Sequence, residues 1–196
     1  PQFPGPNVQA VVVQGFAGAI VHSVGFNKLE SLQRGLILVE PERGIIVATY
    51  EVTAEADDLR EFAKQKLAQR SFWLNVDVDV ETVKDIGPLS FLLPGLIDGH
   101  AHAPQYAFAG KGIDLPLLKW LETYTFPVEA KFSDPDVAQH VYRKAVHRHL
   151  RSGTTTCSYF ATIHLEATKI LVDEVRRAGQ RAYVGLVNMD RNSPDY

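Results

Sequence analysis

The sequence has few cysteines, no long apolar run and no excess of basic residues. Its 196 residues contain a single cysteine, Cys157, which excludes an internal disulfide and favours a reducing compartment. No apolar run approaches the roughly 20 residues needed to cross a bilayer. The formal net charge of −3 offers no basic surface for nucleic acid. The first residues show no basic segment followed by an apolar one, so we expect no secretory signal and a cytoplasmic location.

The apolar residues follow different patterns before and after residue 90. The first 90 residues predict a β-rich region with one helix. One or two short strands are expected over 10–24, a hairpin over 36–39 and 45–50, a helix over 54–70, and a strand over 72–83. In the last of these, Val76, Val78 and Val80 are expected to face inwards, and Asp77, Asp79 and Glu81 to face solvent.

After residue 90 the pattern changes to alternating strands and helices. Strands are expected over 96–102, 154–160 and 181–189, and helices over 133–153 and 165–179. Strand–helix–strand units with short loops predict a parallel sheet, as in a (β/α) barrel or a doubly wound sheet. A full barrel needs roughly 250 residues, so a barrel could only be represented here by its first strands.

Helix boundaries in this half carry recognisable signals. Ser133 is expected to cap the first helix, with Asp136 completing a capping box and Gly153 ending it. A further helix is expected over 114–126. Its core residues are predicted to be Leu117, Leu118 and Leu121.

Two histidines, His100 and His102, stand at the end of the apolar strand in "PGLIDGHAH". Alternate residues of a strand face the same way, so both imidazoles and Asp98 are expected on one face. Two such imidazoles can bind one metal ion, and Asp98 is a candidate to accept a proton from a ring or to orient it. Functional groups gather at the carboxyl ends of parallel strands, where this pair lies. The alternative is a buried, hydrogen-bonded pair without a metal.

Other candidates are better explained by structure. His147 and His149 repeat the His-x-His spacing within a helix, where the two side chains point about 200° apart and cannot share an ion. The acidic segment 77–81 lacks the glycine of a calcium loop and is expected to be a solvated strand face. His164 follows a strand of the second half and is expected to be structural. Cys157 is expected to be a small buried residue and not a nucleophile.

"PGLIDGHAH" resembles the first-strand signature of the amidohydrolase superfamily, which are metal-dependent hydrolases on a (β/α) barrel with a small β-sandwich beside it. "HAPQYAFAGKGIDLPLLKWLETYTFPVEAKF", "SGTTTCSYFATIH" and "GQRAYVGLVNMDRN" narrow the resemblance to the guanine deaminase family. The resemblance implies an α/β fold. Residues 91–196 would form the first strands of a TIM-type (β/α)8 barrel, and residues 1–90 a small β-sandwich-like domain.

The resemblance also implies a reaction, the zinc-dependent hydrolysis of guanine to xanthine and ammonia. His100 and His102 would be two ligands of a single zinc ion. Zinc would make water nucleophilic at neutral pH. The general base is expected beyond Tyr196, so that the chain would be an amino-terminal portion that is inactive alone.

Substrate contacts are implied for the stretch from His102 to Gln105, which includes Ala103 and Pro104. Gln105 offers both an amide donor and an acceptor for the purine edge. Pro104 departs from the serine expected in the family and removes a backbone donor. Trp120 is a candidate wall of the pocket, although an aromatic residue in such a helix is more often packing.

Two alternatives remain open at this point. The chain could belong to another cyclic-amidine hydrolase, such as a cytosine deaminase or a chlorohydrolase-like enzyme, or to a non-catalytic scaffold on the same fold. The expected partner is the small molecule guanine, with neither nucleic acid nor membrane. The resemblance suggests a homodimer.

Overall fold

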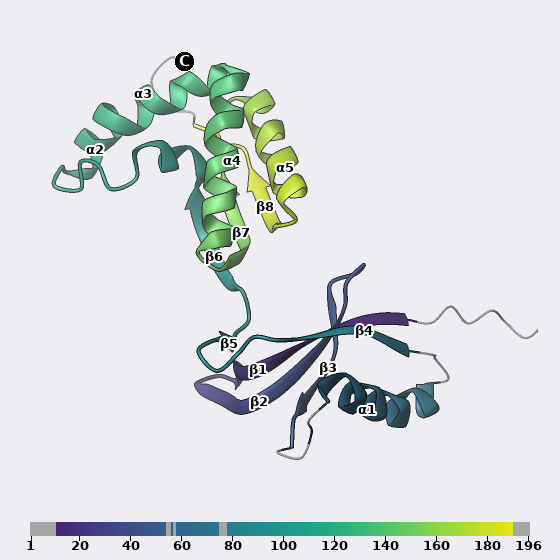
Figure 1. The fold of residues 1–196 in the computed structure, drawn as a ribbon. Helices are drawn as coiled ribbons and strands as arrows, with labels where there is room; N and C mark the ends of the chain where they lie inside the picture. Colours follow the sequence, from purple (N-terminus) through teal and green to yellow (C-terminus); the bar gives the residue numbers. More distant parts are fainter. Residues whose placement is uncertain (1–10, 54–55, 57, 75–77, 190–196) are drawn as a thin grey trace, which may run out of the picture. The chain divides into compact units, whose positions relative to one another are not determined.

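The computed structural model describes residues 11–53, 56, 58–74 and 78–189 (Figure 1). The chain divides into two compact units, one up to Pro94 and one from Gly95 onwards. Within the described residues, no helix is both long and apolar enough to cross a membrane.

The first unit is built on one mixed β-sheet. Strands β1 and β2, and β2 and β3, are antiparallel, whereas β4 and β5 both run parallel to β1. The order is β3-β2-β1-β4, with β5 also paired to β1. The strands are β1 (Val11–Gly25), β2 (Lys28–Glu40), β3 (Ile45–Glu51), β4 (Val78–Asp85) and β5 (Phe91–Leu92).

The predicted hairpin is confirmed as β2 and β3, but the expected short strands form one strand of 15 residues. The pairing of β1 with β2 continues on both sides of a register shift between Gly18 and Ile20. Helix α1 (Leu59–Leu74) buries Ala63 and Leu67 against this sheet. In β4, Val80 is buried and Asp79 exposed, as the alternation predicts; Val76 and Asp77 lie outside the described residues.

The second unit contains the predicted alternation of strands and helices. Strands β6 (Leu96–His102), β7 (Thr154–Phe160) and β8 (Arg181–Gly185) form a parallel sheet in that order. Helices α4 (Pro135–Arg151) and α5 (Leu165–Ala178) connect them (Figure 1). α5 ends where Gly179 adopts the left-handed conformation, with φ 71°, that glycine tolerates best.

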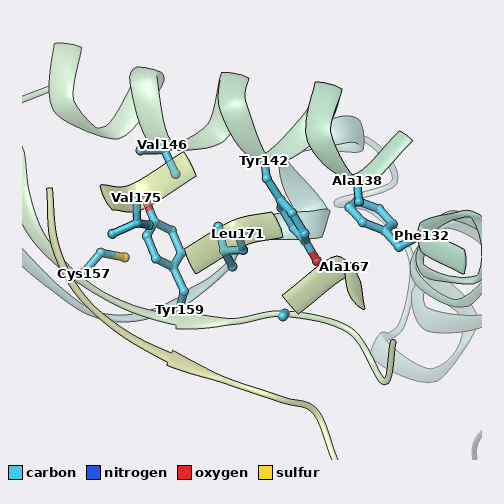
Figure 2. Close-up of a cluster of buried hydrophobic side chains, with 11 residues drawn as sticks. Phe132, Ala138, Tyr142, Val146, Cys157, Tyr159, Ala167, Leu171 and Val175 are labelled. Atoms are coloured by element: carbon cyan, nitrogen blue, oxygen red, sulfur yellow. The ribbon is translucent and has the colours of Figure 1, made fainter. Parts of the chain in front are cut away.

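A single apolar cluster joins these helices to the sheet. Tyr142 and Val146 of α4 and Leu171 of α5 pack over Cys157 and Tyr159 of β7, and all five are almost completely buried (Figure 2). Burying an aliphatic or aromatic side chain of this size contributes about 1.5–3 kcal/mol. The central strand β7 is therefore firmly held, and its opposite face is free to carry other side chains.

The amino-terminal cap of α4 corrects the sequence-based expectation. Asp134, and not Ser133, accepts the hydrogen bond from the Asp136 amide, at 2.9 Å. Ser133 still belongs to the 3-10 turn η3 (Ala130–Ser133), and its hydroxyl donates to the Ala130 carbonyl at 3.0 Å. Pro135 occupies the first turn, where its missing N–H is not needed.

A long excursion separates β6 from α4. It consists of the 3-10 turn η1 (Ala103–Phe108), α2 (Leu117–Trp120), a π-helical turn η2 (Leu121–Thr125), α3 (Phe126–Glu129) and then η3.

The predicted core of this segment is wrong for two residues. Leu117 is 68% exposed and Leu118 73% exposed. The prediction assumed one regular helix over 114–126, whereas the segment is divided into the short helix α2, the π-helical turn η2 and α3. Thr125, Glu129 and Phe132 are buried instead.

Candidate metal centre

The imidazoles of His100 and His102 converge at the carboxyl end of β6. Their Nε2 atoms lie 3.2 Å apart. Two nitrogen ligands of a tetrahedral zinc ion, each about 2.0–2.1 Å from the metal, are separated by about 3.3 Å. The pair therefore already has the spacing that one shared ion requires, with both Nδ1 atoms left for other contacts.

The environment favours the neutral, ligating form of His102. Burial, and secondarily the nearby His100, lowers the pKa of His102 below its ordinary value of 6.5. The phenyl ring of Phe160 on β7 lies against both imidazoles, with centroid distances of 4.4 Å to His100 and 5.2 Å to His102. At neutral pH a lone pair is thus available for a cation.

Asp98 does not share the face of the two histidines, contrary to the expectation from strand alternation. Between Asp98 and Ala101 the strand contains a bulge, because three steps along β6 match two steps along β7. A carboxylate oxygen of Asp98 consequently lies within 4.8 Å of the Cys157 sulfur, on the face covered by the core. The carboxylate still serves the pair indirectly, since it accepts a hydrogen bond from the His100 amide at 3.0 Å.

A hydrogen-bond network occupies the core face of β7. The Tyr159 hydroxyl donates to Gln180 Oε1 at 3.0 Å and lies 3.0 Å from His149 Nδ1. Because the hydroxyl has one proton, it accepts from Nδ1–H of His149. Gln180 in turn donates to the Thr154 carbonyl at 2.9 Å. The network ties α4 to β7 and to the start of β8.

Within the described part of the chain, Asp98, His149 and Cys157 form the one cluster of three potential metal donors, all within 4.8 Å of one another. Burial, together with the charge of Asp98, raises the pKa of the Cys157 thiol to about 11. The thiol is therefore protonated at neutral pH, and Asp98 and His149 are engaged in hydrogen bonds. This arrangement supports packing, as expected for Cys157 and His149, and not a metal centre.

His102, but not His100, lines a cavity of about 590 Å³, a volume within the size range of small-molecule sites. Its lining includes His102, Ala103, Gln105 and Trp120. Pro104 is fully buried and does not line it. Of the four residues from His102 to Gln105, three thus face one cavity, and Trp120 lies in its wall.

Trp120 is held by the loop that precedes it. Its indole Nε1 donates to the Lys111 carbonyl at 2.9 Å. The next residue, Gly112, has φ 64°, and an added Cβ would lie 2.3 Å from Cε2 of Tyr124. Only glycine therefore lets the loop approach these aromatic rings.

His164 lies just after β7, at the amino-terminal cap position of α5. Its Nδ1 is 2.9 Å from the Thr162 hydroxyl, and burial lowers its pKa. These contacts fit the structural role expected for it. Phe160, whose ring lies against both imidazoles, was not among the site residues predicted from the sequence. Alternation from buried Cys157 and Tyr159 could have placed it on the opposite face of β7.

Comparison with known proteins gives a consistent picture. The guanine deaminase of Dictyostelium discoideum is 48% identical over 94% of this chain and 40% of its own length. The guanine deaminase of Homo sapiens is 41% identical over 92% of this chain and 37% of its own length. The chain thus spans about two-fifths of the curated relatives it matches.

A solved structure agrees with these relatives. The crystal structure of guanine deaminase from C. acetobutylicum with guanine bound in the active site is 32% identical, with a TM-score of 0.75, covering 93% of this chain and 38% of that one. Residues 91–196, which include both converging histidines, match the amidohydrolase family. Because this match covers more than half of the sequence, the chain belongs to the amidohydrolase family.

Proposed function

We propose that this chain forms the amino-terminal part of a zinc-dependent guanine deaminase, which hydrolyses guanine to xanthine and ammonia. The observation that carries the proposal is the 3.2 Å separation of the His100 and His102 Nε2 atoms, together with a cavity of small-molecule size that His102 lines. Relatives and a solved structure named guanine deaminase support the choice of substrate.

The two histidines would supply two of the zinc ligands through Nε2. When bound, zinc supplies Lewis acidity that makes water nucleophilic at neutral pH. A zinc site needs at least three protein ligands. The described residues offer no third donor beside this pair, so we expect further ligands and the general base from residues outside the described part of the chain.

The residues that line the cavity would recognise the purine by hydrogen bonding and packing. Gln105 presents an amide that can donate and accept at once, which suits an edge with both kinds of group. Trp120 provides an aromatic wall, and Ala103 is a small residue that leaves room for a flat ring. Pro104 is buried and lacks an N–H, so we assign it the task of fixing the turn after His102.

We also propose a domain arrangement. Residues 1–90 would form the β-sandwich-like domain, and residues 91–196 the first three strands of a TIM-type barrel. The parallel order β6-β7-β8, with connecting helices packed on one face, supports the barrel assignment. The histidines then lie at the catalytic, carboxyl end of the first barrel strand.

The direct test is turnover of guanine by the full-length protein that contains this chain, followed by the absorbance change from guanine to xanthine. His102→Ala should lower kcat/KM by more than about 100-fold, because a metal ligand is lost. His147→Ala is the matched control, since this exposed histidine belongs to the other His-x-His segment. Gln105→Ala should lower kcat/KM about tenfold through loss of a hydrogen bond to substrate.

The outcomes separate the alternatives. The full-length protein could contain zinc and fail to hydrolyse guanine, yet deaminate another base or dechlorinate a triazine. That result would identify another amidohydrolase. Protein without zinc or turnover would support a scaffold. Turnover by the 196-residue chain alone would refute the expectation that two ligands are insufficient.

A further inference from the structure

The phenyl ring of Phe160 contacts both imidazoles. It stacks on His102 with an interplanar angle of 23° and lies tilted at 37° against His100. The two imidazoles are themselves inclined by 59°, with centroids 5.1 Å apart. One ring therefore borders both members of the pair.

This contact matters because little else holds His100. The residue is exposed, whereas His102 is half-buried. Within the described residues, the His100 side chain makes its hydrogen bond to the Nε2 atom of His102. A free imidazole samples several rotamers, and only a few bring both Nε2 atoms to the 3.2 Å spacing. The Phe160 ring on one side of the imidazole excludes many of the rotamers that do not give this spacing.

Phe160 is well placed to act as a fixed surface. It is the last residue of β7, which is paired on both sides, with His102 in β6 and Gly185 in β8. On the opposite face of the same strand, Cys157 and Tyr159 are anchored in the core (Figure 2). The backbone that carries Phe160 is thus held by two ladders and by core packing.

We propose that Phe160 is a positioning residue that fixes the orientation of the His100 and His102 imidazoles for a shared ion. The assignment rests on the proposed zinc site. Phe160 donates no electrons to the metal and does not touch the substrate by this assignment. Its effect is to lower the entropy lost when the two imidazoles bind one ion.

The first test is zinc affinity of the full-length protein, measured by competition with a chromophoric chelator. Phe160→Leu, which removes the flat ring, should weaken zinc binding about tenfold, as expected for residues that orient metal ligands. Phe160→Tyr keeps an aromatic ring at this position. Its zinc affinity should therefore stay within about twofold of that of the parent protein, far less than the loss expected for Phe160→Leu. Tyr183→Leu is the matched control on the neighbouring strand, because this ring is 78% exposed and makes no ring contact with either imidazole in the described structure.

A second measurement needs no metal. In the metal-free full-length protein at pH 8, the ring protons of His100 and His102 should be shifted upfield by the Phe160 ring current. Phe160→Leu should move them downfield, whereas Phe160→Tyr and Tyr183→Leu should leave them in place. Circular dichroism identifies any variant that fails to fold, and the tyrosine variant then remains as the comparison.

The results are decisive in either direction. Unchanged histidine ring resonances, or unchanged zinc affinity in folded Phe160→Leu, would overturn the assignment. Failure of the full-length protein to bind zinc would instead overturn the proposed function, while the metal-free comparison would still show whether the Phe160 ring lies against the two imidazoles.

Discussion

Replacing Glu129 with glutamine should remove a pH-dependent loss of stability from the second unit. Glu129 lies in α3 and is only 4% exposed. Burial raises the pKa of its carboxyl group from 4.5 to about 7. The group is therefore protonated in the folded state under mildly acidic conditions, where an unfolded chain would already have released the proton.

The size and sign of the effect follow from that difference. Between pH 4.5 and 7 the unfolded state binds fewer protons than the folded state, so the free energy of unfolding falls as the pH rises. A pKa difference of about 2.5 corresponds to about 3 kcal/mol, which is fully lost by about pH 8. Below pH 4.5 both states are protonated, and this group then contributes no pH dependence. Glutamine does not titrate, so the variant lacks this slope.

Urea unfolding followed by Trp120 fluorescence measures the stability of the second structural unit, which contains both Trp120 and Glu129. The sequence contains two tryptophans, and a Trp73→Phe background leaves Trp120 as the reporter. The free energy of unfolding of Glu129→Gln, minus that of its parent, should rise by about 3 kcal/mol between pH 4.5 and pH 8. Taking the difference cancels the other titrating groups that the two proteins share.

Glu122→Gln is the matched control for this experiment. Its side chain lies in the preceding turn, is 64% exposed and is only 3.5 Å from Lys119. It should change the pH dependence by less than about 0.5 kcal/mol. If Glu129→Gln behaves like this control, Glu129 is already ionised in the folded protein and the reasoning from burial is refuted.

Three further substitutions test individual contacts. Asp98→Ala should weaken zinc binding to the full-length protein about tenfold in chelator competition, because the carboxylate holds the His100 amide, and Asp98→Asn should lose less because its amide oxygen still accepts. Asp134→Ala should lower the free energy of urea unfolding by about 1 kcal/mol, whereas Ser133→Ala should change it by less than about 0.5 kcal/mol. Gly112→Ala should raise KM for guanine and destabilise the unit by at least about 1 kcal/mol, because a Cβ collides with the aromatic rings at a positive φ.

The parts of the fold that could be predicted are those with strong local signals. The strand Leu96–His102 was predicted to the residue, because an apolar run leads into it and a loop follows. The end of α5 at Gly179 was equally predictable, since its left-handed conformation favours glycine. The cap at Asp134 was missed because two adjacent residues, Ser133 and Asp134, both have capping side chains, and the preceding 3-10 turn decides between them.

Errors at the site have a non-local origin. The face of Asp98 depends on a bulge that exists only in the pairing of β6 with β7, more than 50 residues away in sequence. Phe160 and Tyr159 reach the site through the same pairing. Periodicity within one strand could therefore predict that His100 and His102 act together, but not which side chains from other elements border them.

The two His-x-His segments show why the motif alone is a weak predictor. In β6 the side chains of His100 and His102 share a face, and their Nε2 atoms approach to 3.2 Å. In α4 the same spacing leaves His147 exposed, while His149 turns inwards and bonds to Tyr159. The strand geometry permits a shared ion, whereas the helix geometry forbids one. The bulge in β6 places the two kinds of side chain on opposite faces of the strand. The carboxylate of Asp98 points towards the core, and the imidazoles lie on the other face, where a cation can bind both.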